Sequence, residues 1–123
     1  MNSKSSSNKA QLQNFIDERI DNLLPMIVER LNTVLELPHH SVVNQGEYKD
    51  REEERLFYYV GKGDCKVTVR DVTGKETFVR RLDEGDHFGE MQIIYDSPRT
   101  ATVVSLNYNT YAVMSVPLFK RLV

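Results

Sequence analysis

Apolar and polar positions alternate over several short stretches in the second half of the chain. Turn residues such as Thr73-Gly74 bound these stretches. Alternation with a period of two is typical of strands with one buried face, and short strands at regular spacing favour an antiparallel roll or barrel. The predicted strands cover residues 56–60, 65–70, 76–82, 100–106 and 110–114. We expect a hairpin turn at Gly61-Lys62-Gly63-Asp64.

The N-terminal part follows a different period. Apolar residues recur at helical spacing between Leu12 and Leu35, which predicts an N-terminal helical segment over residues 11–37. Pro25 falls inside this pattern, so either the helix kinks there or a second helix begins there. The apolar stripe favours packing against the rest of the fold. Residues 1–10 are rich in Ser, Asn and Lys, which predicts a disordered tail.

A last helix is predicted at the end of the sequence. Ser115 suits an N-cap and Pro117 suits the first turn that follows it. The predicted fold class is therefore mainly β with flanking helices. Residues 38–123 are expected to form an antiparallel, jelly-roll-like β-roll, also described as a double-stranded β-helix, which ends in the start of this C-terminal helix.

Composition restricts the classes of function. The 123 residues carry a formal net charge of -2, so the basic face required for nucleic acid is missing. Apolar runs are too short to cross a bilayer and no secretory signal is present, which predicts a cytoplasmic protein. Cys65, the single cysteine, alternates with Val67 and Val69 and is predicted to fill the core rather than to react.

Candidate chemistry is concentrated in FGEMQIIYDSPRTATV, residues 88–103. Gly85 and Gly89 predict tight turns, and residues 91–95 suit one or two helical turns whose first N–H groups lack partners. Such a turn binds anions, and Arg99 would face it. Glu90 would repel a phosphate but can accept a hydrogen bond from a sugar hydroxyl.

The same residues allow a simpler interpretation. Glu90 can stabilise the first turn of a short helix. Arg99 can then pair with Glu90 or Asp96 in an ordinary ion pair. Either residue taken alone favours this reading, whereas the combination favours a ligand with a phosphate and a ribose.

In this combination the segment resembles the phosphate-binding cassette of cyclic nucleotide-binding domains. In that family FGE, an apolar run and PR-(A/T)-A-T-V follow in the same order. The resemblance extends upstream through LFYYVGKGDCKVTV, and Gly46, Gly63 and Gly85 fall where the family has glycines. It covers roughly residues 40 to 120.

The resemblance implies a role for each residue of the cassette. Arg99 would bind the exocyclic phosphate oxygens and Glu90 would accept the ribose 2′-hydroxyl. Gly89, Met91 and Gln92 would offer main-chain N–H groups, with Gln92 standing where the family often has alanine. The implied function is a non-catalytic sensor without a further cofactor, which relays nucleotide occupancy to an effector such as a kinase or a cation channel.

The identity of the base stays open between guanine and adenine. Thr100 stands where the family has alanine or threonine, and threonine is commoner among cGMP readers, although some channel domains with threonine respond to cAMP. Val79 and Arg80 resemble the positions from which cGMP-dependent kinases read guanine, whose O6 and N7 suit a guanidinium. The alternation places Phe78, Arg80 and Leu82 on one face. Arg80 can instead extend to solvent, and together these residues favour cGMP.

A structural domain that keeps the fold but has lost the ligand is the alternative function. No metal site is predicted, because His39 and His40 are adjacent and His87 is distant in sequence. Family members continue into a helix that closes over the base, so a chain ending at Val123 would bind weakly and exchange quickly.

Overall fold

The computed structural model describes residues 11–12, 14–23, 31–90 and 96–122. Residues 11–12 and 14–23 are helical, which confirms the first part of the predicted N-terminal helical segment. The expected tail, the region around Pro25 and the short helix expected at residues 91–95 lie outside the described residues.

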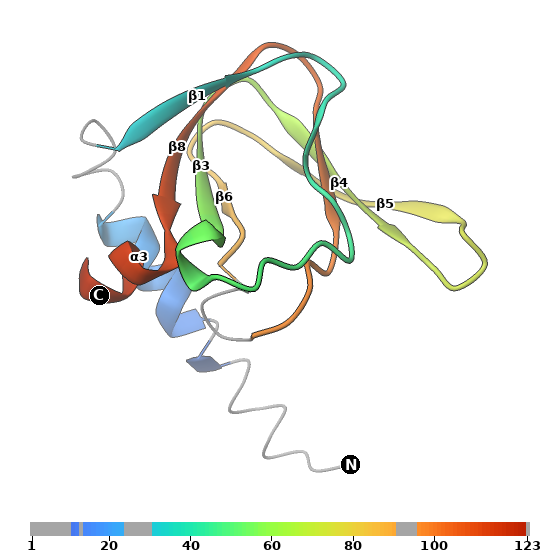
Figure 1. Ribbon diagram of the computed structural model, residues 1–123. Helices are drawn as coiled ribbons and strands as arrows, with labels where there is room; N and C mark the ends of the chain where they lie inside the picture. Colours follow the sequence, from blue (N-terminus) through green and yellow to red (C-terminus); the bar gives the residue numbers. More distant parts are fainter. Residues whose placement is uncertain (1–10, 13, 24–30, 91–95, 123) are drawn as a thin grey trace.

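Two antiparallel four-stranded sheets make up the body of the protein. Their strand orders are β1-β8-β3-β6 and β2-β7-β4-β5. Figure 1 shows the sheets curving around a common interior, with the helical residues gathered at one end beside α3. This arrangement confirms the predicted β-roll with flanking helices. The elements are β1 (Asn32–Glu36), β2 (Ser41–Val43), η2 (Glu52–Glu54), β3 (Leu56–Lys62), β4 (Cys65–Arg70), β5 (Glu76–Leu82), β6 (His87–Phe88), β7 (Thr102–Ser105), β8 (Asn109–Ser115) and α3 (Val116–Leu122).

Strand β1 corrects the predicted boundary of the N-terminal helical segment. Residues 32–36 were expected to be helical, but they pair with β8 from Asn32 opposite Val113 to Glu36 opposite Asn109. A few apolar residues can fit either a helix with a period of 3.6 or an extended strand. Here the strand forms because pairing with β8 supplies its main-chain hydrogen bonds. The partner strand is about 80 residues away in sequence, so local periodicity does not reveal it.

The turn after β3 is also different from the prediction. β3 pairs with β6 and β8, whereas β4 pairs with β5 and β7. Residues 61–64 therefore carry the chain from one sheet to the other instead of closing a hairpin. Asn109 holds this turn, because its Oδ1 accepts the Asp64 N–H at 3.2 Å and its Nδ2 donates to the Asp64 carbonyl at 2.9 Å. The hairpin predicted at Thr73-Gly74 is confirmed by the pairing of β4 with β5.

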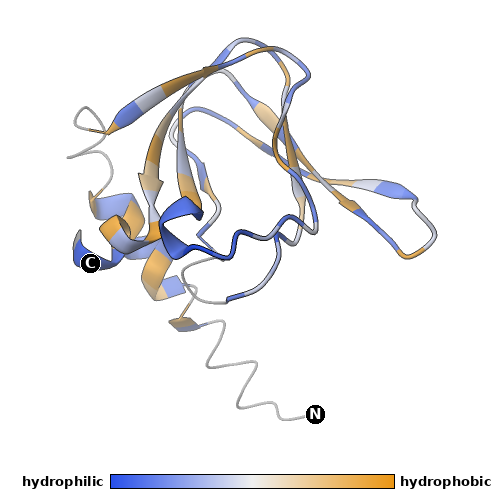
Figure 2. Ribbon diagram, in the orientation of Figure 1, coloured by the Kyte–Doolittle hydropathy of each residue, from blue (hydrophilic) through white to orange (hydrophobic). Residues whose placement is uncertain are grey.

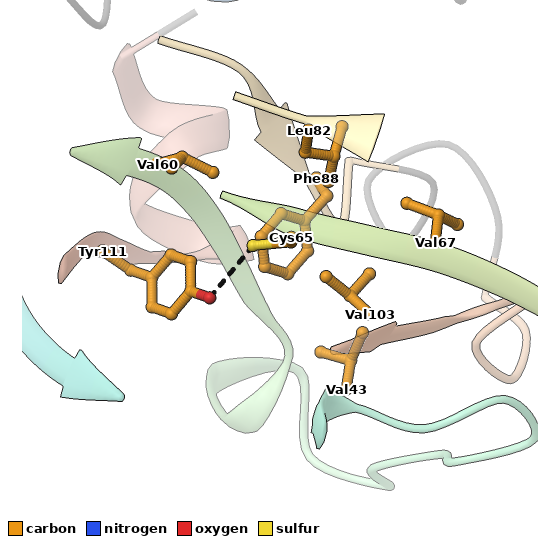
Figure 3. Packing of buried hydrophobic residues seen from close by; sticks show 8 residues of the cluster. All are labelled: Val43, Val60, Cys65, Val67, Leu82, Phe88, Val103 and Tyr111. Atoms are coloured by element: carbon orange, nitrogen blue, oxygen red, sulfur yellow. Dashed lines mark hydrogen bonds between the residues drawn. The ribbon is translucent and has the colours of Figure 1, made fainter. Parts of the chain in front are cut away.

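The main core lies between the two sheets (Figure 3). Cys65 belongs to it, as predicted, and its Sγ lies 3.1 Å from the Tyr111 hydroxyl. Burial raises the pKa of the Cys65 thiol, which favours the unreactive protonated form. The buried members of this main core are Val43, Val60, Cys65, Val67, Leu82, Phe88, Val103 and Tyr111.

A second hydrophobic cluster lies between the helices and the β1-β8-β3-β6 sheet, on the face of that sheet that points away from the main core. Ile16 and Ile20 pack with Phe57 of β3, Met114 of β8 and Phe119 of α3. The stripe of the N-terminal helix is therefore a packing surface, as predicted. In Figure 2 the helices at this end of the roll carry hydrophobic segments, and the ribbon of η2 beside them is hydrophilic.

Helix α3 begins where the sequence predicts it. The Ser115 hydroxyl accepts the Leu118 N–H at 3.3 Å, which is the expected N-cap bond. Neighbouring η2 lies in the charged segment KDREEER, and its Glu52 pairs with Lys120 of α3 at 2.6 Å. The C-terminal helix is thus held by both an apolar face and a charged one.

Candidate functional site

A cavity of about 160 Å³ opens at the junction of β6, the segment before β7 and β5. It collects the predicted site residues Gly89, Glu90, Arg99, Thr100 and Arg80. Met91 and Gln92 lie outside the described residues. Val43, Val67, Phe88, Ala101 and Val103 supply its apolar wall.

Gly89 brings bare main chain to this cavity. Its φ is +97°, a conformation that side chains disfavour. A Cβ atom built there would lie 2.8 Å from the Leu56 carbonyl oxygen and 2.9 Å from Nη1 of Arg99. Only glycine therefore lets the cassette approach both β3 and the guanidinium so closely.

Arg99 is fixed by its main chain and by one side-chain bond. Its N–H donates to the Glu47 carbonyl and its carbonyl accepts the Gly46 N–H, both at 2.8 Å. These bonds explain why β7 begins at Thr102, two residues later than predicted. Nη2 of Arg99 donates to the Leu56 carbonyl at 2.8 Å.

Within the described part of the chain, no carboxylate forms an ion pair with the Arg99 guanidinium. Burial lowers the pKa of its guanidinium, and the nearby Tyr58, Glu47 and Glu90 oppose that effect only at longer range. The simple ion pairs considered from the sequence do not form, because Asp96 pairs with another arginine, Arg55, at 3.0 Å. A half-buried guanidinium in this state favours binding of an anion.

Glu90 is 9% exposed and faces His87. Nδ1 of His87 lies 3.6 Å from Oε2 of Glu90, and its Nε2 lies 3.5 Å from Oδ1 of Asp21. Burial lowers the pKa of His87, but Glu90, Asp17 and Asp21 raise it by more, so the pKa ends above its ordinary value. Glu90 therefore has the His87 imidazole on one side and the cavity on the other.

The structure brings together a set of ligand atoms that the sequence analysis did not foresee. Asp17, His87 and Glu90 each place one such atom within 4.8 Å of the others. Asp17 lies on the N-terminal helix, so no local spacing could have indicated the group. Both carboxylates of this group, together with Asp21, raise the pKa of the His87 imidazole.

A β-bulge in β5 changes the predicted orientation of its side chains. Arg80 lies opposite Val67, whereas Phe78 lies opposite the next residue, Thr68. Neighbouring strand residues point to opposite faces, so Arg80 shares its face with Leu82 but not with Phe78, contrary to prediction. Arg80 lines the cavity, while Val79 is 53% exposed and does not line it.

Aromatic residues behind the cavity were not singled out from the sequence. Tyr58 stacks on Phe88 with ring centres 4.8 Å apart, and Tyr111 meets the edge of both rings. The alternation of β3 and β8 indicates that these residues face inward, but their meeting depends on sheet pairing. They give the apolar wall a rigid support.

Residues 38–123 match the family of cyclic nucleotide-binding domains, and the chain belongs to this family. It is 42% identical over 57 residues to a cAMP-dependent protein kinase regulatory subunit of Dictyostelium discoideum, covering 46% of this chain and 17% of the relative. It is 35% identical over 78 residues to a cGMP-dependent protein kinase of Drosophila melanogaster, covering 61% of this chain and 8% of the relative. The chain thus spans less than a fifth of the length of these relatives.

A solved structure agrees with this assignment. The regulatory domain of Toxoplasma gondii PKA with cAMP is 30% identical and superposes with a TM-score of 0.67, covering 75% of this chain and 34% of that one. None of the helices in the described part of this chain has the length and apolar composition needed to cross a lipid bilayer.

Proposed function

We propose that this chain is a non-catalytic sensor module that binds cGMP or cAMP and relays occupancy to an attached effector. The observation that carries the proposal is the half-buried guanidinium of Arg99, which lines the cavity beside Gly89 and has no carboxylate partner among its described contacts. A phosphate would supply the missing negative charge.

The proposed binding mode separates the two ends of the ligand. Arg99 binds the exocyclic phosphate oxygens, and the main-chain N–H groups of Gly89, Met91 and Gln92 add further donors. Glu90 accepts the ribose 2′-hydroxyl. This division is supported by the cavity, which has both Arg99 and Glu90 in its wall, and by His87, whose Nδ1 lies 3.6 Å from Oε2 of Glu90.

For the base we propose a preference for cGMP over cAMP. Arg80 extends from β5 to the cavity wall, where a guanidinium can donate to guanine O6 and N7. Thr100 also lines the cavity and offers a hydroxyl. Relatives include cAMP-dependent kinase regulatory subunits and cGMP-dependent kinases, so the family alone does not choose between the bases.

The effector is proposed from the relatives. They are regulatory subunits or kinases that are several times longer than this chain, which favours a kinase as the attached partner and leaves a cation channel as the alternative. No chemical step is proposed, because hydrolysis would require a base or a metal aimed at phosphorus and Glu90 is assigned to the ribose.

Calorimetric titration with cGMP, cAMP and 5′-GMP tests the proposal. We expect both cyclic nucleotides to bind, cGMP more tightly, and 5′-GMP to bind more weakly than cGMP. Arg99→Ala should weaken binding at least about tenfold, because a hydrogen bond to a charged group contributes about 1.5 to 3 kcal/mol. Arg51→Ala removes the same charge from an exposed position and should leave affinity unchanged.

The outcomes separate the alternatives. If neither cyclic nucleotide binds at millimolar concentration, the chain is a structural domain that has lost its ligand. If both bind but Arg99→Ala behaves like Arg51→Ala, the binding site has been assigned to the wrong residues.

A further inference from the structure

Arg55 is a buried charge that the binding mode above does not use. It is the last residue before β3 and is 8% exposed. Taking a guanidinium out of water is costly unless its donors are satisfied and its charge is compensated. The partners that compensate Arg55 therefore indicate what it holds in place.

Those partners come from two separate segments. Nε of Arg55 donates to the Lys49 carbonyl at 2.8 Å, and Nη2 donates to the Tyr48 hydroxyl at 2.8 Å and to the Asp50 carbonyl at 3.2 Å. The guanidinium carbon also lies 4.9 Å from the centre of the Tyr48 ring. Nη1 pairs with Oδ1 of Asp96 at 3.0 Å. Arg55 thus joins residues 48–50 to the end of the phosphate cassette.

The contacts of Asp96 and Arg99 close this network. The Tyr48 hydroxyl donates to the same Oδ1 of Asp96 at 2.7 Å. Three residues later, the main chain of Arg99 is bonded to Gly46 and Glu47. Both ends of residues 96–99 are therefore attached to residues 46–55. At Arg99 the main chain makes the attachment, and at Asp96 the side chains of Arg55 and Tyr48 make it.

Arg55 is itself anchored on its other side. Its carbonyl accepts the N–H of Val116, the first residue of α3, at 3.0 Å. The next carbonyl along the chain, that of Leu56, accepts Nη2 of Arg99. The Arg99 guanidinium is thus bonded to the residue that directly follows Arg55. Since Asp96 is engaged by Arg55, it does not compete with a ligand for Arg99.

We propose that Arg55 is a positioning residue for nucleotide binding: through Asp96 and Tyr48 it fixes residues 96–99 and so aims Arg99 into the cavity. This inference rests on the proposed function. It assigns a role to a segment, KDREEER, whose run of mixed charges is by itself typical of a solvated loop or a short helix.

A double-mutant cycle tests this role with cGMP as the probe. Arg55→Gln should weaken binding at least about tenfold, and Tyr48→Phe, which keeps the ring and removes the hydroxyl, about threefold. Arg51→Gln is the matched control in the same segment, and we expect affinity within about twofold of wild type. The same substitution is then made in an Arg99→Ala background, where NMR titration up to millimolar cGMP measures the weaker affinity. In that background Arg55→Gln should change the affinity by less than about twofold.

Additive losses would overturn the proposal, because they would mean that Arg55 acts independently of Arg99. Equal affinities for Arg55→Gln and Arg51→Gln would overturn it as well. If Arg55→Gln does not fold, Tyr48→Phe and Asp96→Asn provide the same comparison with smaller changes in volume and charge.

A measurement on the ligand-free protein separates this inference from the proposed function. In ¹⁵N NMR spectra, the main-chain amide and Nε–H signals of Arg99 should move in Arg55→Gln and Tyr48→Phe but not in Arg51→Gln. Unchanged Arg99 signals refute the positioning role even if nucleotide binds. Wild-type protein that binds no cyclic nucleotide refutes the proposed function, while the NMR comparison still decides whether Arg55 positions Arg99.

Discussion

Replacing Gly89 by alanine places one methyl group at the most crowded point of the site. The new Cβ would lie 2.8 Å from the Leu56 carbonyl oxygen and 2.9 Å from Nη1 of Arg99. Real Cβ contacts essentially never fall below 3.0 Å, so something must shift. The carbonyl is main chain of β3, so relief requires the main chain at residue 89 to move away from it and the Arg99 side chain to move as well.

The free-energy cost has two parts. Adopting φ of +97° costs an alanine about 1 to 2 kcal/mol relative to glycine. Displacing Arg99 breaks its hydrogen bond to Leu56, which adds about 1 kcal/mol. Gly74→Ala isolates the first part, because Gly74 has a φ of +88° with no atom within 4 Å of the added Cβ.

Thermal unfolding and titration measure the difference between the two variants. With an unfolding entropy of about 2.1 cal/mol/K per residue over 123 residues, 1 kcal/mol corresponds to about 4 °C. We expect Gly89→Ala to melt at least about 4 °C below Gly74→Ala and to bind cGMP at least about tenfold more weakly. Equal melting temperatures and equal affinities in the two variants would refute the reasoning.

Three further predictions concern the other groups around the cavity. Glu90→Gln should weaken binding of cGMP about tenfold and leave binding of its 2′-deoxy analogue nearly unchanged, as measured by calorimetry; equal losses would contradict the ribose contact. Arg80→Ala should lower the ratio of cGMP to cAMP affinity, and an unchanged ratio would return Arg80 to the role of a solvent-facing side chain. The raised pKa of His87 contributes stability that is fully present below its unfolded pKa of about 6.5 and is lost as pH rises through the folded pKa. Melting curves from pH 5.5 to pH 8.5, about one unit below and two above that value, should therefore show the advantage of wild type over His87→Gln shrinking, and a constant difference would contradict the Glu90 and Asp21 contacts.

The central residues of the candidate site could be recognised in the sequence because they lie close together in it. Gly89, Glu90 and Arg99 fall within eleven residues, and their types already describe an anion and a hydroxyl partner. Strands β3, β4, β5, β7 and β8 were accessible for the same reason, since alternation is a local property of each strand. The structure collects all three residues around one cavity, as expected.

Long-range pairing accounts for the errors. The bulge at β5 depends on the register with β4, and it moves Phe78 to the face opposite Arg80. The turn at residues 61–64 leads to another sheet because Asn109, 45 residues from Asp64, holds it there. Neither partner is visible in a local pattern.

The sequence by itself therefore determined the class of fold and the chemistry of the cassette, since both depend on short, local runs of residues. The tertiary structure decided how that chemistry is held. Arg99 reaches the Leu56 carbonyl across 43 residues, and Arg55 reaches Asp96 across 41. A buried arginine binds a ligand or serves as a support, depending on which acceptors the fold brings to it. The reason is that burial removes the water that would otherwise satisfy an N–H donor left without a partner.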